Sequence, residues 1–342
     1  MYAFIIRRLF LLIFVLFGVS ILIFGILSTF SPERRAASFI NSPQQAEKIP
    51  EIIKKYGLDE PFYIQYFRWL KEISSGNFGW SLVASMPVLG AFWQYLPVTI
   101  ELNLFALPLI IFIGIWLGTK SGIHQNTFID HSTRIFAIIG WSLPTFLFAL
   151  ILLMVFYGYF SIFPPGIISD EINLFILDNP DKYVAYTGMY TIDGILNNQF
   201  KITFDALKHL VLPVFTQVIV MAALLMRVMR SGMIEEISKD YILTVKAKGA
   251  DWKTIYYKHA RKNALLPVIT IAGQMVATSI QGSIAVEVIF NRQGMGWWIA
   301  ESATQLDMPV LLCVCLFMGF VFVITNLIMD ILYAFIDPRI VY

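Results

Sequence analysis

The chain has 342 residues, of which 58% are hydrophobic and only 14% are charged, and its mean hydropathy is +0.70. These values exclude a water-soluble globular domain and indicate a protein that crosses a membrane several times. The net charge of +2 is too small to indicate a nucleic-acid partner, and the sequence has no GKS or GKT for a phosphate-binding loop. Any ATP hydrolysis must therefore come from another chain.

Uncharged runs near the length of a single span recur along the chain, and we expect six transmembrane helices. A helix needs about 20 apolar residues to cross a hydrocarbon core of about 30 Å. The runs cover residues 9–32, 102–119, 135–157, 210–226, 264–286 and 308–329.

The first run follows Arg7 and Arg8 and lacks a convincing small-residue cleavage site. It therefore predicts a retained span, residues 1–32, with its N-terminus in the cytoplasm. Residues 33–96 are rich in aromatic side chains and are expected to form an extracytoplasmic loop subdomain. Packing of these aromatics on the membrane surface and direct contact with a partner both remain open.

The third run contains Pro144, which removes a backbone hydrogen bond and predicts a kinked helix. Residues 158–205 then carry six acidic side chains against two lysines, which indicates an extracytoplasmic insertion. Its turn-rich surface suits either contact with a substrate-delivering protein or a simple surface loop.

The basic stretch between the fourth and fifth runs organises the rest of the chain. From Arg227 to Lys262 it has nine basic and four acidic residues, so it is expected to stay in the cytoplasm. Ser238 is expected to cap a short helix over residues 239–248, and Gly249 to end it. Asp251 is expected to cap a second helix. The pattern predicts two short helices with a tight corner, projecting from the membrane.

The run DYILTVKAKGADWKTIYYKHARKNALLPVIT in this stretch resembles the cytoplasmic loop of permease subunits of binding-protein-dependent ABC importers, in particular the first permease of oligopeptide and dipeptide systems. The segments LPVTIEL, WSLPTF, EVIFNRQGMG and DILYAFIDPR also resemble this family, in the same order. The sequence departs from the wider importer pattern, because Leu243-Thr244-Val245 stands where Glu-Ala-Ala is usual and Leu266-Pro267 comes late.

The resemblance implies an all-α type I ABC importer permease fold with both termini cytoplasmic, and a domain of helices 2–6 over residues 97–342 that contains the insertion 158–205 and a coupling loop 227–265. It further implies a coupling helix that sits in a groove of a separate ATPase subunit. The expected coupling residues are Asp240, Tyr241, Thr244, Lys246, Ala247, Lys248, Gly249, Ala250 and Asp251.

Thr270, Gln274, Thr278 and Gln281 share one face of the predicted fifth span. Because polar groups facing lipid are costly, this face is expected to line either the translocation path or a contact between helices. Glu101 and Glu287 are expected to lie at the boundaries of spans rather than to carry protons. The four histidines and Cys313 and Cys315 show no spacing typical of a metal site or disulfide, and no catalytic group stands out.

The sequence thus predicts a non-enzymatic permease subunit of an ATP-driven importer in a bacterial or archaeal cell membrane. By resemblance, its partners are a second related permease, two ATPase subunits that bind ATP and Mg²⁺, and an extracytoplasmic binding protein. The substrate is expected to be an oligopeptide or dipeptide, with an oligosaccharide or a nickel chelate as alternatives. An ion-coupled carrier and a structural membrane subunit are the alternatives outside this class.

Overall fold

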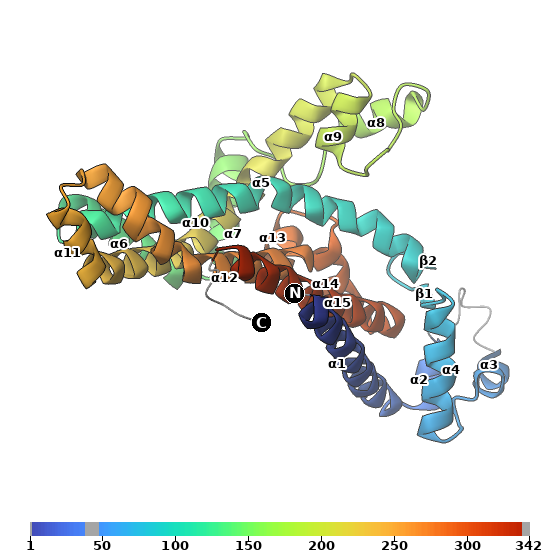
Figure 1. Ribbon diagram of the computed structural model, residues 1–342. Coiled ribbons are helices and arrows are strands. Elements are labelled where there is room, and N and C mark those ends of the chain that lie inside the picture. The colour runs from blue at the N-terminus through green and yellow to red at the C-terminus, as the bar shows by residue number, and fades with distance from the viewer. Residues whose placement is uncertain (1, 38–47, 337–342) are drawn as a thin grey trace.

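The computed structural model describes residues 2–37 and 48–336, and it is helical apart from one short hairpin (Figure 1). The fold is built around long helices. They are α1 (Tyr2–Ser28), α5 (Val88–Ile123), α10 (Phe200–Ile237), α12 (Arg261–Ile280), which continues the π-helical segment η3 (Thr254–Ala260), and α15 (Met308–Ile336).

The remaining elements are short and lie at the ends of the long helices and between them. They are α2 (Pro32–Ala37), α3 (Ile49–Tyr56), α4 (Phe62–Ser74), β1 (Trp80–Ser81), β2 (Met86–Pro87), α6 (Phe128–Ser142), α7 (Thr145–Leu152), the π-helical η2 (Leu153–Tyr159), α8 (Asp170–Asp178), α9 (Tyr190–Leu196), α11 (Asp240–Ala247), α13 (Ile284–Ile289) and α14 (Met295–Thr304). Strands β1 and β2 pair in an antiparallel hairpin.

Four helices of the described chain are long and apolar enough to cross a membrane: Val88–Ile123, Phe200–Ile237, Thr254–Ile280 and Met308–Met329. A fifth span forms if Phe128–Ser142 and Thr145–Tyr159 are counted together. In α1 the apolar stretch Ile13–Ile26 is shorter than a span. The predicted count of six therefore stays a prediction, as does the cytoplasmic C-terminus, because Asp337 to Arg339 lie outside the described residues.

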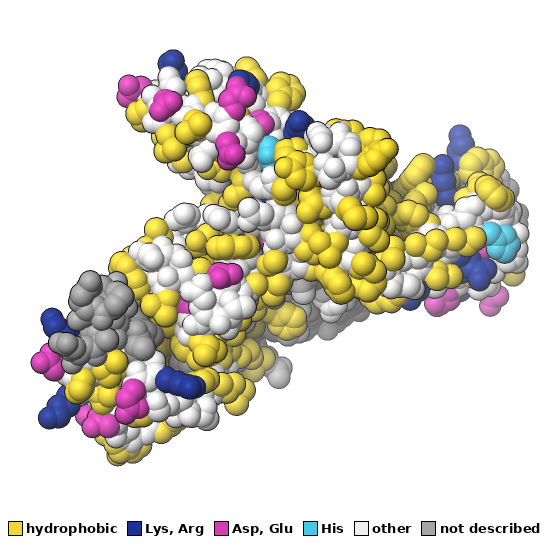
Figure 2. Space-filling model, turned by 180° about the vertical axis from the view of Figure 1, so that it is seen from behind, with side chains coloured by type: hydrophobic (Ala, Val, Ile, Leu, Met, Phe, Trp, Pro, Cys, Tyr) yellow, Lys and Arg dark blue, Asp and Glu magenta, His cyan; other side chains and the backbone are white. Residues whose placement is uncertain are grey.

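Charged side chains gather at the two extremities and on the insertion, while apolar side chains cover much of the middle on the face that Figure 2 shows. This distribution suits a chain whose middle lies in hydrocarbon and whose ends lie in water. It agrees with the sequence-based prediction of a multispan, all-α membrane protein.

Two of the predicted spans are interrupted in the structure. Pro144 does more than kink a helix, because the axes of Phe128–Ser142 and Thr145–Tyr159 meet at 100°. The fifth span was expected to reach residue 286 but ends at Ile280. Gly282 breaks it with a φ of +93°, and a Cβ there would lie 2.3 Å from the amide nitrogen of Gly296. Glycine therefore fits both the backbone and the close approach.

Helices α5 and α10 form the centre of the fold and pack parallel to each other at close range (Figure 1). A stripe of glycines on α5 allows this, because a Cβ at each would come within 2.6 Å of a side-chain atom on α10. The facing pairs are Gly114 with Leu225, Gly118 with Met229, and Gly122 with Met233. At 38 residues α10 spans about 57 Å, so it extends well beyond a hydrocarbon core of about 30 Å.

Candidate coupling loop, translocation face and buried ion pairs

The predicted cytoplasmic projection is formed by the end of α10, α11 and the start of η3. Helix α11 ends at Ala247, and Gly249 follows with a φ of +78° and no atom within 4 Å of a Cβ built on it. The Gly249 amide donates to the Lys246 carbonyl at 2.9 Å. The predicted role of Gly249 as the helix terminator is confirmed.

The two predicted caps have different outcomes. Ser238 does not cap α11, because its hydroxyl donates to the Glu235 carbonyl at 2.7 Å and so satisfies the end of α10. Asp251 does cap the next helix. Its carboxylate accepts hydrogen bonds from the Thr254 hydroxyl and from backbone amides of the first turn, and these bonds lower the pKa of Asp251.

A cluster around Glu236, here called the Glu236 clamp, fixes α11 to its neighbours. The Tyr241 hydroxyl donates to Glu236 Oε2 at 2.7 Å, and Lys239 Nζ lies 2.5 Å from Glu236 Oε1. Asn263 Nδ2 lies 3.2 Å from Tyr241 Oη. Burial, and then the nearby Glu236, raise the pKa of Tyr241, so the phenol remains a donor. Because these residues come from α10, α11 and α12, a displacement of α11 would be transmitted to both long helices.

The outer side of this projection faces solvent. Ile242 is fully buried and anchors α11, whereas most of the predicted coupling residues around it are exposed. Leu243 is 60% exposed and Trp252 is 55% exposed. The sequence analysis did not select these two, although large apolar side chains in a charged loop are a signal for a partner contact. The exposed predicted residues are Asp240, Thr244, Lys246, Ala247, Lys248, Gly249 and Asp251, with Tyr241 and Ala250 half-buried.

Three of the four polar residues predicted for the translocation path lie on α12. Gln274 and Thr278 are exposed and Thr270 is half-buried. Both threonine hydroxyls donate to carbonyls of their own helix, Thr278 at 3.1 Å and Thr270 at 3.3 Å. Gln281 follows the last residue of the helix and is half-buried.

The adjoining face of α12 carries the small residues and packs on the chain's own core. A Cβ on Gly273 would lie 2.0 Å from the sulfur of Met329 on α15, and Ala277 is 1% exposed. The small residues therefore allow close packing inside this chain. The polar face lies beside that contact, and on it Gln274 and Thr278 are exposed.

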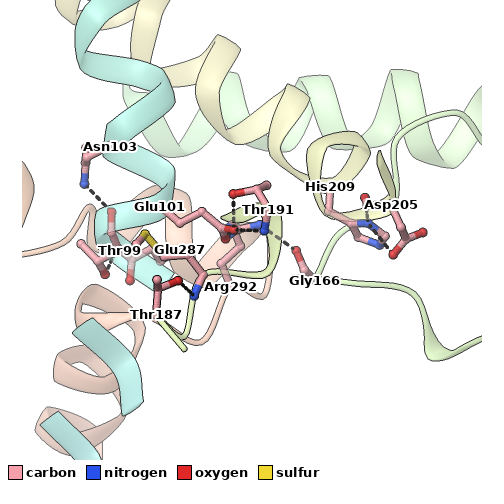
Figure 3. A network of polar contacts seen from close by, with 11 residues as sticks. Thr99, Glu101, Asn103, Gly166, Thr187, Thr191, Asp205, His209, Glu287 and Arg292 are labelled. Carbon is pink, nitrogen blue, oxygen red and sulfur yellow. Dashed lines mark hydrogen bonds and ion pairs between the residues drawn. The ribbon is translucent and has the colours of Figure 1, made fainter. Parts of the chain in front are cut away.

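Glu101 and Glu287, which are predicted to lie at the boundaries of spans, are both buried inside the protein. Both are 0% exposed, and Figure 3 shows them in one network with Thr99, Thr191 and Arg292. Arg292 Nη2 lies 3.0 Å from Glu101 Oε2, and both the amide and the hydroxyl of Thr191 donate to Glu101 Oε1 at 2.8 Å. Arg292 Nη1 also donates to the Gly166 carbonyl at 3.3 Å. The insertion 158–205 is thus bonded to α5 and to the loop after α13.

Glu287 organises the irregular segment that follows the broken fifth span. It accepts bonds from the Thr99 hydroxyl at 2.9 Å and from the amides of Gly296 at 2.8 Å and Ser283 at 3.2 Å. Burial raises the pKa of the Glu287 carboxyl, although these donors oppose the shift. Through these hydrogen bonds the buried Glu287 carboxylate links α5 to the segment 281–297.

Another ion pair, between the half-buried Arg230 and a buried carboxylate, lies near the C-terminal end of α10. Arg230 binds the fully buried Asp130 through two hydrogen bonds, Nε to Oδ1 at 2.6 Å and Nη2 to Oδ2 at 2.9 Å. The Ser121 hydroxyl and the Asn126 amide also donate to Asp130. One of the nine basic residues counted in the loop is therefore paired in the protein interior.

Comparison with known proteins covers the whole chain. Residues 110–342 match the family model described as "Binding-protein-dependent transport system inner membrane component", and residues 1–109 match the model of the N-terminal part of such components. These families place the chain in the inner membrane.

Among curated proteins, the chain is 36% identical over 343 residues to the dipeptide transport system permease protein DppB of Alkalihalophilus pseudofirmus, and 37% identical over 343 residues to the oligopeptide transport system permease protein AppB of Bacillus subtilis, with 100% of both chains covered in each case. It is 35% identical over 329 residues to the probable D,D-dipeptide transport system permease protein DdpB of Escherichia coli, covering 96% of this chain and 94% of that one. The chain belongs to the family of binding-protein-dependent transport system inner membrane components.

Proposed function

We propose that the chain is the permease subunit of an ATP-driven importer for dipeptides or oligopeptides. Similarity over the full length to permeases named for peptide transport supports this substrate class above oligosaccharides and nickel chelates. The experiment is uptake of a radiolabelled dipeptide by cells with and without this chain. Loss of dipeptide uptake with unchanged uptake of an oligosaccharide and of nickel supports the proposal, and unchanged dipeptide uptake contradicts it.

We propose that an ATPase subunit binds the exposed side of α11. The main support is its construction: Ile242 and the Glu236 clamp hold the helix rigidly, while the side with Leu243, Lys246 and Lys248 is free of this chain. A rigid projection with an exposed apolar side chain suits a groove on a partner. Two ATPase subunits would bind ATP and Mg²⁺, and this chain would contribute no catalytic group.

A second related permease and an extracytoplasmic binding protein complete the proposed assembly. ATP binding would change how α11 is held, and the Glu236 clamp would pass that change to α10 and α12. Coupling requires that the contact between α11 and the ATPase subunit differ in free energy between the two nucleotide states. A contact that is equally strong in both states shifts no equilibrium.

The polar face of α12 is proposed to line half of the translocation path. Its support is that Gln274 and Thr278 face away from the core of this chain, although they sit on an apolar helix. Replacing Gln274 by Leu tests this role. A change in the relative uptake of dipeptides with unchanged assembly supports a path, whereas loss of copurifying permease with unchanged preference supports a helix contact.

We also propose the predicted topology, with the loop 227–265 in the cytoplasm and the segments 33–96 and 158–205 outside. In this arrangement α11 and the insertion would lie on opposite sides of the membrane. Single cysteines at Lys246 and at Lys182, labelled in intact cells with a membrane-impermeant maleimide in a background that lacks Cys313 and Cys315, test it. Labelling at residue 182 alone is expected, and labelling at residue 246 contradicts the topology.

A further inference from the structure

A cavity of about 440 Å³ lies where the segment 49–79 meets the ends of α1 and α15. Phe24 near the end of α1, and Pro309 and Leu312 in the first turns of α15, line its apolar part. Trp69 of α4 also lines it and stacks at a tilt on Phe24, with ring centroids 5.2 Å apart. In Figure 1 this region lies at the opposite end of the molecule from α11.

Cationic side chains line the other part of the cavity. They are Arg35, Lys55, Arg68 and Lys71, against the single lining carboxylate of Glu72.

The carboxylates nearby leave part of this charge uncompensated. Glu60 pairs with Arg68 at 2.9 Å, and Glu72 accepts a hydrogen bond from Asn77 at 2.7 Å. Lys55 and Lys71 form no ion pair within the described part of the chain. The cavity therefore has a net positive wall.

One cation of this wall, Arg35, is held in place by the fold. Arg35 donates to the side-chain oxygen of Gln65 at 2.5 Å and to the Leu58 carbonyl at 2.7 Å. Gln65 is 8% exposed and itself donates to the Leu58 and Glu60 carbonyls. These bonds connect α2, α4 and the turn before α4, so the guanidinium is held at the cavity by a buried support.

We propose that this cavity binds one anionic phospholipid, with the phosphodiester against Lys55, Lys71 and Arg68 and the acyl chains over Phe24 and Leu312. The cavity lies at the ends of two apolar helices, which is the depth of lipid headgroups, and Trp69 and Tyr56 are the side-chain types that favour this interface. A small soluble anion would leave the apolar part unfilled, and a neutral lipid would leave the lysines uncompensated. Basic pockets beside membrane spans bind anionic headgroups by the same pairing of charge and apolar surface.

Native mass spectrometry of the delipidated full-length chain tests the proposal. Phosphatidylglycerol, phosphatidylcholine with the same acyl chains, and inorganic phosphate are the three probes. We expect one phosphatidylglycerol to bind about tenfold more tightly than phosphatidylcholine. The double variant Lys55→Gln with Lys71→Gln should lose this preference, because it removes two positive charges beside the headgroup.

The matched control is Lys48→Gln with Lys54→Gln, which removes the same charge at α3 without touching the cavity lining. It should bind phosphatidylglycerol like the unmodified chain. Equal binding of the two lipids, or an equal effect of both double variants, overturns the proposal. Displacement of the lipid by millimolar phosphate also overturns it, because the site would then recognise only an anion. Circular dichroism of both variants separates a lost site from a lost fold.

Discussion

The guanidinium of Arg292 lies 3.0 Å from the carboxylate of Glu101, and both side chains are completely buried. The two residues are 191 positions apart in sequence, and the contact joins α5 to the loop after α13. Thr191 on α9 bonds to the same carboxylate. One ion pair therefore connects the insertion, a central span and the segment that follows the broken fifth span (Figure 3).

Replacing Arg292 by Met should destabilise the fold by about 3 to 5 kcal/mol, because it leaves a buried carboxylate without its partner. The double variant Glu101→Leu with Arg292→Met should recover much of this loss. Thermal unfolding of the purified chain, followed by a fluorescent thiol or tryptophan signal, measures both. The exposed Arg134, replaced by Gln, is the control. Additive effects of the two single changes would contradict a direct interaction.

The close packing of α5 on α10 predicts a strong effect at Gly118. Replacing it by Ala places a Cβ 2.6 Å from Met229 Cβ and 2.8 Å from the Met226 carbonyl oxygen, so the helices must move apart. We expect a loss of about 1 to 3 kcal/mol in stability. The change Gly25→Ala, at a position with no atom within 4 Å, should leave the unfolding temperature unchanged. Equal temperatures for both variants would refute the packing argument.

Gly249 is expected to tolerate no β-branched residue, because its φ of +78° lies in the left-handed region. Replacing it by Val should alter the corner after α11 while leaving the spans inserted. In an assembled importer, we expect dipeptide uptake to fall more than tenfold with less effect on ATP hydrolysis. Replacing it by Asn, which accepts this conformation more readily, is the matched control. Normal uptake by Gly249→Val would show that the corner plays no part in coupling.

The Glu236 clamp leads to a separate expectation for Tyr241. The change Tyr241→Phe removes the 2.7 Å hydrogen bond to Glu236 and keeps the ring, at a cost of about 1 kcal/mol to local stability. We expect less peptide to be transported per ATP hydrolysed, since α11 would be held less firmly to α10. Tyr257→Phe, at an exposed position of the same loop, is the control. An unchanged ratio of peptide uptake to ATP hydrolysis would show that the Glu236 clamp plays no part in coupling.

The sequence predicted those features that depend on local patterning. Hydropathy indicated the apolar helices, Pro144 indicated a kink but not a bend as large as 100°, and the left-handed preference of glycine indicated the corner at Gly249. The resemblance of the loop 227–265 led to the family that the comparisons confirm. These signals are carried by neighbouring residues, so they can be read without tertiary contacts.

The features that sequence reasoning missed depend on contacts distant in the chain. Glu101 and Glu287 occur at the ends of apolar runs. An unpaired carboxylate costs less free energy at the membrane interface than in the membrane interior, so burial was not expected. Their partners, Arg292 and Thr99, come from other elements. Ser238 was assigned to the wrong helix end because a serine between two helices suits either one. The repeated spacing of Gly114, Gly118 and Gly122 was the available signal for the α5 contact.

The most direct measurement for the account is cross-linking from Lys246→Cys on the exposed side of α11. The cysteine-substituted chain is expressed with its transport partners in a background without Cys313 and Cys315, and treated with a short bifunctional maleimide. We predict a cross-link to a nucleotide-hydrolysing subunit whose yield changes when ATP is bound, with no such product from Lys182→Cys on the insertion. Absence of any ATPase adduct at residue 246, or an equal yield from residue 182, would contradict the assignment of this loop as the coupling element.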